Sequence, residues 1–189
     1  MKAAFVIYDG MTTLDFIGVY DALTRLKTMG FMADFTWDVC ALVDTVTDGT
    51  GLRLLPSRVG GSLAGYDLVI VPGGPGARAR AGDPAFLDWL RTAAPSARKA
   101  SVCSGALILG AAGFLRGRRA TTHRTAFDEL RALGMIEVVD ERVVDEGEVV
   151  TARGVSSSID LGLYLVEQIA GSEIRRRIQR QMDYQPEVE

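Results

Sequence analysis

Histidine and cysteine are scarce in this sequence, which has one histidine and two cysteines among 189 residues. A structural zinc site takes four Cys or His ligands, so a zinc centre built from these residues is not expected. A disulfide-built scaffold is not expected either, because such small secreted domains are dense in cysteine. We therefore predict that Cys40 and Cys103 are two free thiols, and we predict no metal and no cofactor.

An excess of basic residues and a long apolar run are also missing. Lys and Arg number 21 against 24 Asp and Glu, which gives a net charge of -3 and a pI near 5.3. Nucleic-acid binders usually present a basic face, so we expect no nucleic-acid partner and interpret the four arginines of 173–180 as a solvated or interface helix face. The apolar stretch 106–115 is far shorter than the ~20 residues of a membrane span. The N-terminus MKAAFVIYDG has no secretory apolar core, so we predict a cytoplasmic protein with a small-molecule substrate and no membrane partner.

Short runs rich in Val and Ile alternate with longer segments of helical period, a pattern typical of βαβ units around a parallel sheet. The main strands are predicted at 3–8, 36–43, 68–71 and 99–102, with shorter ones at 136–139, 142–144 and 148–151. The helices are predicted at 14–29, 83–94, 104–112, 125–133, 157–170 and 172–182. No repeat or linker divides the chain, so we expect a single α/β domain over residues 1–189, with a mostly parallel sheet.

The stretch ASVCSGALIL places Cys103 where a buried strand runs directly into a helix. This pattern is similar to the nucleophile elbow G-x-S-x-G, with Ser101 and Gly105 in the positions of the two glycines. Such a corner lies at the carboxyl edge of the sheet, where open α/β folds bind ligands. The helix dipole is expected to lower the pKa of the thiol and favour a nucleophilic thiolate. The alternative is that Cys103 is a small buried apolar residue, and local spacing leaves both interpretations open.

Three further features lie near the same predicted edge. The glycine-rich turn 71–76 follows a strand and either directs backbone N–H groups at an oxyanion or is a simple tight turn. Asp15 follows the first strand and is a candidate acid or base, but Thr12-x-x-Asp15 is also a capping-box pattern, in which the carboxylate only stabilises a helix start. His123 is either a base or a structural residue.

Four segments carry a resemblance to a known family. They are FVIYDGMTTLDFIGVYDAL, DLVIVPGGPGA, SVCSGALILGAAGFLRGRRATTH and ERVVDEGEVVTARGVSSSIDLGLYLVEQIAG. Together they span nearly the whole chain, which resembles the ThiJ/PfpI superfamily and, within it, the isocyanide (isonitrile) hydratases. The resemblance implies a flavodoxin-like, class I glutamine-amidotransferase-like three-layer sandwich with helices on both faces of the sheet and a cysteine at the elbow.

The resemblance also assigns roles to individual residues. They are Cys103 as nucleophile, Asp15 as its neighbouring carboxylate, Ser104 as a further catalytic residue, and Gly74, Gly154 and Val155 as substrate or oxyanion contacts. The chain departs from the hydratase pattern in having Ser104 where Thr is usual and Arg153 where Gly is usual. Arg153 would narrow or charge the pocket, which leaves the substrate open.

The favoured hypothesis is a cysteine-dependent lyase that adds water to an isocyanide and releases an N-substituted formamide. Cys103 would form a thioimidate, with Asp15 as general acid and then base. One alternative is a glyoxalase- or deglycase-like enzyme acting on reactive carbonyls, which usually has a nearby His and a Glu at the position of Asp15. Another is a non-catalytic stress sensor in which Cys103 is oxidised.

A homodimer is also expected, since symmetric dimers are the commonest assembly and are frequent in the superfamily. The apolar residues predicted to form the interface are Phe16, Tyr20, Phe114 and Leu115.

Overall fold

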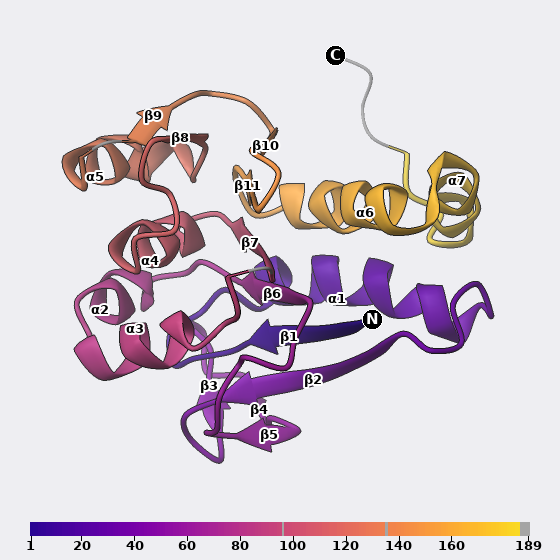
Figure 1. Ribbon diagram of the computed structural model, residues 1–189, viewed down its shortest axis with the longest axis horizontal. Coiled ribbons are helices and arrows are strands. Elements are labelled where there is room, and N and C mark those ends of the chain that lie inside the picture. The colour runs from indigo at the N-terminus through magenta and orange to yellow at the C-terminus, as the bar shows by residue number, and fades with distance from the viewer. Residues whose placement is uncertain (96, 135, 186–189) are drawn as a thin grey trace.

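The computed structural model describes residues 1–95, 97–134 and 136–185, and its centre is a seven-stranded sheet (Figure 1). The strand order is β10-β11-β7-β6-β1-β2-β5, and every neighbouring pair is parallel except β10 and β11. These strands are β1 (Lys2–Val6), β2 (Thr36–Ala41), β5 (Arg58–Val59), β6 (Leu68–Val71), β7 (Arg98–Val102), β10 (Val143–Asp145) and β11 (Val149–Ala152). The predicted mostly parallel α/β sheet is confirmed.

Helices cover both faces of the sheet. They are α1 (Thr13–Thr28), α2 (Ala77–Ala81), α3 (Pro84–Arg91), α4 (Gly105–Ala111), α5 (Phe127–Ala132), α6 (Ser157–Ala170) and α7 (Ser172–Gln181), with a short 3₁₀ helix, η1 (Arg124–Ala126). Helices α1 and α6 pack against each other on one face with α7 beside them, while α2, α3 and α4 cover the other (Figure 1). After β1 the chain continues to β2, towards one edge of the sheet, and after β6 it continues to β7, towards the other edge. Because such connections are right-handed crossovers, the helices of the two connections lie on opposite faces of the sheet. No helix in the described ranges is both long and apolar enough to cross a membrane.

Several small strands lie outside the expected pattern. Strands β3 (Val46–Thr47) and β4 (Arg53–Leu54) form a separate antiparallel pair, and β8 (Arg118–Ala120) pairs in parallel with β9 (Ile136–Val138). The run predicted as a strand at 136–139 is therefore a strand, but it belongs to this two-stranded sheet. Two or three residues are too few to show the alternation of polar and apolar side chains on which strand prediction depends.

Helix ends follow local chemistry. Asp83 accepts hydrogen bonds from the backbone N–H groups of Ala85 and Phe86, and Pro84 occupies the first position of α3. The helix nevertheless ends at Arg91 and not at Ala94. The segment predicted as one helix at 125–133 begins instead as the 3₁₀ turn η1 and continues as α5.

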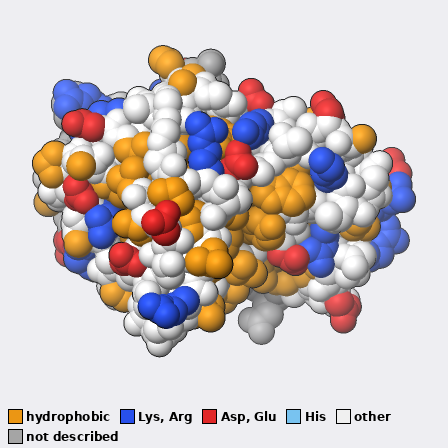
Figure 2. Space-filling view, turned by 90° about the horizontal axis from the view of Figure 1, so that it is seen from below, with side chains coloured by type: hydrophobic (Ala, Val, Ile, Leu, Met, Phe, Trp, Pro, Cys, Tyr) orange, Lys and Arg blue, Asp and Glu red, His pale blue; other side chains and the backbone are white. Residues whose placement is uncertain are grey.

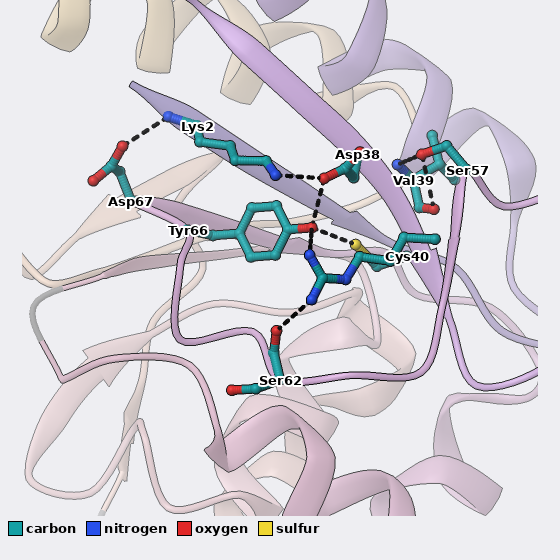
Figure 3. Close-up of polar contacts among 9 residues, drawn as sticks. Lys2, Asp38, Val39, Cys40, Ser57, Ser62, Tyr66 and Asp67 are labelled. Atoms are coloured by element: carbon teal, nitrogen blue, oxygen red, sulfur yellow. Dashed lines mark hydrogen bonds and ion pairs between the residues drawn. The ribbon is translucent and has the colours of Figure 1, made fainter.

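Cys40 on β2 belongs to a polar network away from the cysteine corner (Figure 3). The Tyr66 hydroxyl donates to Asp38 at 2.7 Å and lies 3.5 Å from the Cys40 sulfur and 3.4 Å from an Arg58 nitrogen, while Lys2 pairs with Asp38 at 2.8 Å. Cys40 is fully buried, and burial raises the pKa of its thiol. Both cysteines are free thiols, and Cys40 has the inert setting of a structural one.

Candidate active site

Cys103 occupies the corner between β7 and α4, where the sequence predicts it. Its φ angle is 56°, in the left-handed region that residues other than glycine rarely adopt. Its backbone N–H donates to the carbonyl of Ala152 at 3.0 Å, and its carbonyl accepts from the Thr122 hydroxyl at 2.8 Å. Strained backbone persists only where the surroundings impose it, and such residues cluster at functional sites. Two chain segments thus hold the cysteine in a nucleophile-elbow conformation.

The glycine turn after β6 joins the elbow to the start of α1. The Gly73 N–H donates to Asp15 Oδ2 at 3.0 Å, and the Gly73 carbonyl accepts from the Thr12 N–H at 2.8 Å. The Gly74 N–H donates to Ser104 Oγ at 2.9 Å, and the Ser104 hydroxyl lies 3.2 Å from the Gly74 carbonyl. One dipeptide therefore positions both the carboxyl group and the residue after the nucleophile. Gly74 and Ser104 were both expected to contact the substrate. In the structure the Gly74 N–H and the Ser104 hydroxyl instead form a hydrogen bond with each other.

Close approach of backbones explains why glycine is required in this turn. A Cβ atom on Gly73 would lie 2.5 Å from the Ser104 nitrogen and 2.8 Å from the Cys103 Cβ. A Cβ on Gly105 would lie 2.4 Å from the Val71 carbonyl oxygen. All three distances are far below van der Waals contact, so a side chain at either position would separate the turn from the elbow.

Gly73→Ala is therefore expected to lower the free energy of unfolding by about 1–3 kcal/mol, the usual cost of overpacking. Gly65→Ala is the matched control, because a Cβ there meets no atom within 4 Å and its φ is not in the left-handed region. Urea denaturation of both variants measures the difference. Equal stability of the two would show that the turn adapts without cost.

Asp15 is fully buried in the first turn of α1. Its Oδ2 accepts the Gly73 bond, and its Oδ1 has no hydrogen-bond partner among the described residues. Burial raises the pKa of Asp15 to about 7, and the Gly73 N–H and the Cys103 thiol oppose this rise only in part. Thr12 makes no side-chain cap on the helix, so the capping-box interpretation is wrong. The carboxyl group has a pKa suited to proton transfer near neutral pH.

The expectation of a lowered thiol pKa at Cys103 is wrong. Burial raises the pKa of this thiol to about 12, the charge of Asp15 adds to the rise, and hydrogen bonds from Ser104 oppose it. Helix α4 has only seven residues, and the sulfur lies in a nearly dry site beside a carboxylate. Loss of water and like charge therefore outweigh the helix dipole. At rest the thiol holds its proton, and any negative charge is on Asp15.

The loop after β11 emerges beside the cysteine, because the carbonyl of Ala152 accepts the Cys103 N–H. Gly154 and Val155 follow in this loop, and both are partly exposed. A Cβ on Gly154 would lie 3.1 Å from the ring of His123. These two loop residues and His123 therefore lie at the same edge of the sheet as Cys103, which agrees with the placement expected for Gly154 and Val155.

Two nearby residues are engaged in contacts of their own. His123 Nδ1 accepts from the Thr125 N–H at 3.3 Å and caps η1, which supports the structural interpretation of the histidine. The guanidinium of Arg153 pairs with Asp140 at 2.5 Å, and Arg124 reaches the same carboxylate at 3.2 Å. Arg153 and Arg124 therefore share the single negative charge of Asp140.

Tyr8 and Thr122 also belong to the site, although sequence patterns alone do not point to them. The buried Tyr8 hydroxyl donates to the Pro72 carbonyl at 2.8 Å, and the tyrosine interacts electrostatically with Asp15 and Cys103. Their only sequence signal is position, since Tyr8 follows the first strand and Thr122 lies in the RATTH segment. In residues 1–95, 97–134 and 136–185, no group of three or more His, Cys, Asp or Glu could hold a metal ion.

Comparisons with known proteins give a consistent result. A model of the DJ-1/PfpI family matches residues 1–168. Isonitrile hydratase from Pseudomonas putida is 36% identical over 187 residues, covering 98% of this chain and 79% of the relative. The crystal structure of a ThiJ/PfpI family protein from Pseudomonas syringae superposes with a TM-score of 0.85 at 30% identity, covering 99% of this chain and 76% of that one. The glutathione-independent glyoxalase DJR-1.2 of Caenorhabditis elegans is 31% identical over 109 residues, covering 57% of this chain and 58% of the relative.

Proposed function

The chain belongs to the DJ-1/PfpI family, and from this premise we propose that it is a cysteine-dependent hydratase that converts isocyanides to N-substituted formamides. The observation that carries the proposal is the buried Asp15 carboxyl group, which Gly73 holds beside the Cys103 thiol and whose pKa is raised to about 7. Similarity to an isonitrile hydratase over 98% of the chain supports the same chemistry.

The first step forms a thioimidate. Asp15, as carboxylate, accepts the thiol proton, and the sulfur of Cys103 bonds to the terminal carbon of the isocyanide. The same proton then passes from Asp15 to that carbon, which gives R–N=CH–S–Cys103. The pKa of Asp15 near 7 lies below that of the thiol, about 12, so transfer of the proton from the sulfur is unfavourable by itself and is driven by formation of the carbon–sulfur bond.

The second step consumes water. Its oxygen bonds to the thioimidate carbon, one of its protons is taken by Asp15, and the nitrogen is protonated. The carbon–sulfur bond then breaks, the hydroxyl proton is lost as the carbonyl forms, and the sulfur regains a proton. The products are R–NH–CHO and the free thiol, so one water is added and no oxidant or reductant is needed.

Conversion of an aryl isocyanide to the formamide, followed by chromatography, tests the proposal. Turnover by the wild-type protein is the expected result. The same preparation is also assayed with methylglyoxal, because similarity to a glyoxalase suggests reactive carbonyls as the alternative substrate class. Consumption of methylglyoxal with no formamide would replace the hydratase by a carbonyl enzyme, and oxidation of Cys103 with neither activity would favour the sensor.

We also propose that the protein forms a homodimer, from whose interface two of the four residues first expected are excluded. Phe16 and Leu115 are buried in the core of the protomer and are not available to a partner. Apolar side chains gather on the face that Figure 2 views, which includes β2 to β5. The large exposed ones in this region are Leu42, Val43, Leu52, Leu55 and Val59. Light scattering after size exclusion is expected to give twice the chain mass of 20.4 kDa, and a monomeric mass would reject the dimer.

A further inference from the structure

A cavity of about 440 Å³ lies at the amino edge of the sheet, and its lining is rich in positive charge. It is bounded by the end of α3, the start of β7, the segment after α4 and the start of β11. The charged residues that line it are Arg91, Lys99, Arg116, Arg118 and Glu148. Four cations thus accompany one carboxylate, in a protein whose net charge is -3. The volume falls in the range of about 300–1,000 Å³ that is typical of small-molecule sites.

This cavity is separate from the cysteine site. Lys99 lies near the start of β7 and is the register partner of Val149, the first residue of β11, whereas Cys103 follows the other end of β7. A strand advances by about 3.3 Å per residue, so Lys99 and Cys103 are roughly 13 Å apart along it. No step of the proposed reaction uses the cavity, and a ligand bound there would not touch the reacting groups.

Lys99 is a buried cation that only neutral groups contact. Its side chain belongs to a residue that is 3% exposed, and its ammonium donates to the carbonyls of Ala94 at 2.8 Å and Pro95 at 3.2 Å. The nitrogen lies 5.1 Å from the centre of the Phe114 ring. No carboxylate forms an ion pair with it in residues 1–95, 97–134 and 136–185, and burial lowers its pKa. Buried charges are normally paired with opposite ones, so an anion in the cavity would supply the missing partner.

The three arginines of the lining differ in their contacts. Arg91 donates to two carbonyls at the carboxyl end of α4, at 3.2 and 3.1 Å, and pairs with Asp88 at 2.8 Å. Arg118 pairs with Glu148. Arg116 is exposed, and its guanidinium makes no hydrogen bond or ion pair within the part of the chain that the structure describes. One arginine of the cavity is therefore available to a ligand without the loss of an existing contact.

We propose that this cavity binds a phosphate monoester of a small organic molecule, with Lys99 and Arg116 as its principal contacts. These two cations have no counter-charge, and their sum of two positive charges matches a phosphate monoester, which carries about -1.5 to -2 at neutral pH. Guanidinium and ammonium groups are the usual phosphate-binding groups of proteins. The cavity has room for more than a phosphate group, and the Phe114 ring in its wall provides an apolar contact for the organic part. The inference does not depend on the proposed hydratase activity.

Calorimetric titration of the protein at constant ionic strength tests the proposal without any turnover. The probes are inorganic phosphate, ribose 5-phosphate and AMP. The expected result is one-to-one binding of an ester that is tighter than binding of inorganic phosphate. Tighter binding of AMP than of ribose 5-phosphate would identify the ligand as a nucleotide, and equal or weaker binding would identify it as a sugar phosphate.

Variants of the lining locate the binding. Arg116→Gln is expected to weaken ester binding roughly tenfold, which is the usual effect of losing one hydrogen bond to a charged group. Lys99→Met keeps an apolar stem of similar length without the charge and is expected to weaken binding at least as much. Arg53→Gln is the matched control and should bind as the wild type does. Arg53 on β4 is also exposed and without an ion pair in the described ranges, but it lies outside the cavity.

Three results would overturn the proposal. They are no binding of either ester, binding of the esters no tighter than that of inorganic phosphate, and equal losses of affinity in Arg116→Gln and Arg53→Gln. Circular dichroism verifies that each variant is folded. If Lys99→Met does not fold, the comparison of Arg116→Gln with Arg53→Gln still decides, because both side chains are exposed.

Discussion

We expect that replacement of Cys103 by serine lowers the rate of formamide production by at least about a thousandfold. The hydroxyl has nearly the size of the thiol, and the backbone contacts to Ala152 and Thr122 do not involve the side chain. The loss therefore reports the chemistry of sulfur, because an alcohol is much harder to deprotonate and is a weaker nucleophile. Cys103→Ala is expected to lose activity to the same extent. Initial rates with an aryl isocyanide provide the measurement.

The control for this experiment is the other thiol. Cys40→Ala removes a buried cysteine whose sulfur contacts the Tyr66 hydroxyl on another part of the sheet. We expect this variant to retain most of the wild-type rate. More than a tenth of the activity remaining in Cys103→Ser would mean that the sulfur is not the attacking atom, and the mechanism would then need a different nucleophile.

Asp15→Asn is expected to lower kcat by about a hundred- to ten-thousandfold, the range typical of a lost general acid–base group. The amide keeps an oxygen to accept the Gly73 N–H but cannot take the thiol proton. In the wild type, kcat/KM should rise with pH through about 7 as Asp15 ionises, since the carboxylate form accepts that proton. The residual activity of the variant should lack this rise. A pH profile with the same midpoint in both proteins would assign the ionisation to another group.

The same substitution is expected to stabilise the fold above neutral pH. The pKa of Asp15 is raised from 3.8 in its ordinary state to about 7 in the native protein, so the native state holds the proton more tightly than the unfolded chain. The stabilising effect of the protonated group is complete below about pH 4 and is lost as the pH rises through about 7. At pH 8 the Asn variant, which lacks this loss, should be more stable by at most about 4 kcal/mol.

Urea denaturation at pH 4 and pH 8 measures this effect. The difference between wild type and Asp15→Asn should be larger at pH 8 than at pH 4. Asp44→Asn, at an exposed position after β2, is a control for removal of one carboxylate from the surface. A constant difference at both pH values would mean that the carboxyl group ionises equally easily in the folded and unfolded states.

Much of the sheet could be predicted because its central strands are buried on both faces. Strand β6 reads as a short apolar run, and the segment between it and β7 has helical period, whereas β7 is buried although it contains Arg98, Lys99 and Ser101. Strand β5 could not be found in this way. It consists of Arg58 and Val59, both exposed at the sheet edge, and its position depends on pairing with β2 and not on its own sequence.

The positions of the site residues could be predicted, because they follow from where the strands end. The pKa of the thiol could not be predicted, because it depends on what surrounds the side chain. Cys103 and Asp15 each follow a parallel strand, so the rules of the fold bring them to one edge. The pKa of the thiol depends on how much water surrounds the sulfur and on a carboxylate 88 positions away in the chain. Likewise, the pairing of Arg78 with Glu129 joins helices that no local pattern connects.

The bonds of the glycine turn also have a consequence for how activity appears during folding. Gly73 and Asp15 are separated by 58 positions and Gly74 and Ser104 by 30, so these contacts form only when three distant parts of the chain have met. Closing such long loops and pairing parallel strands are slow steps compared with forming helices. A refolding chain will therefore regain its helical signal before the Asp15 carboxyl group and the Cys103 sulfur are brought together. Recovery of catalysis reports the last stage of assembly.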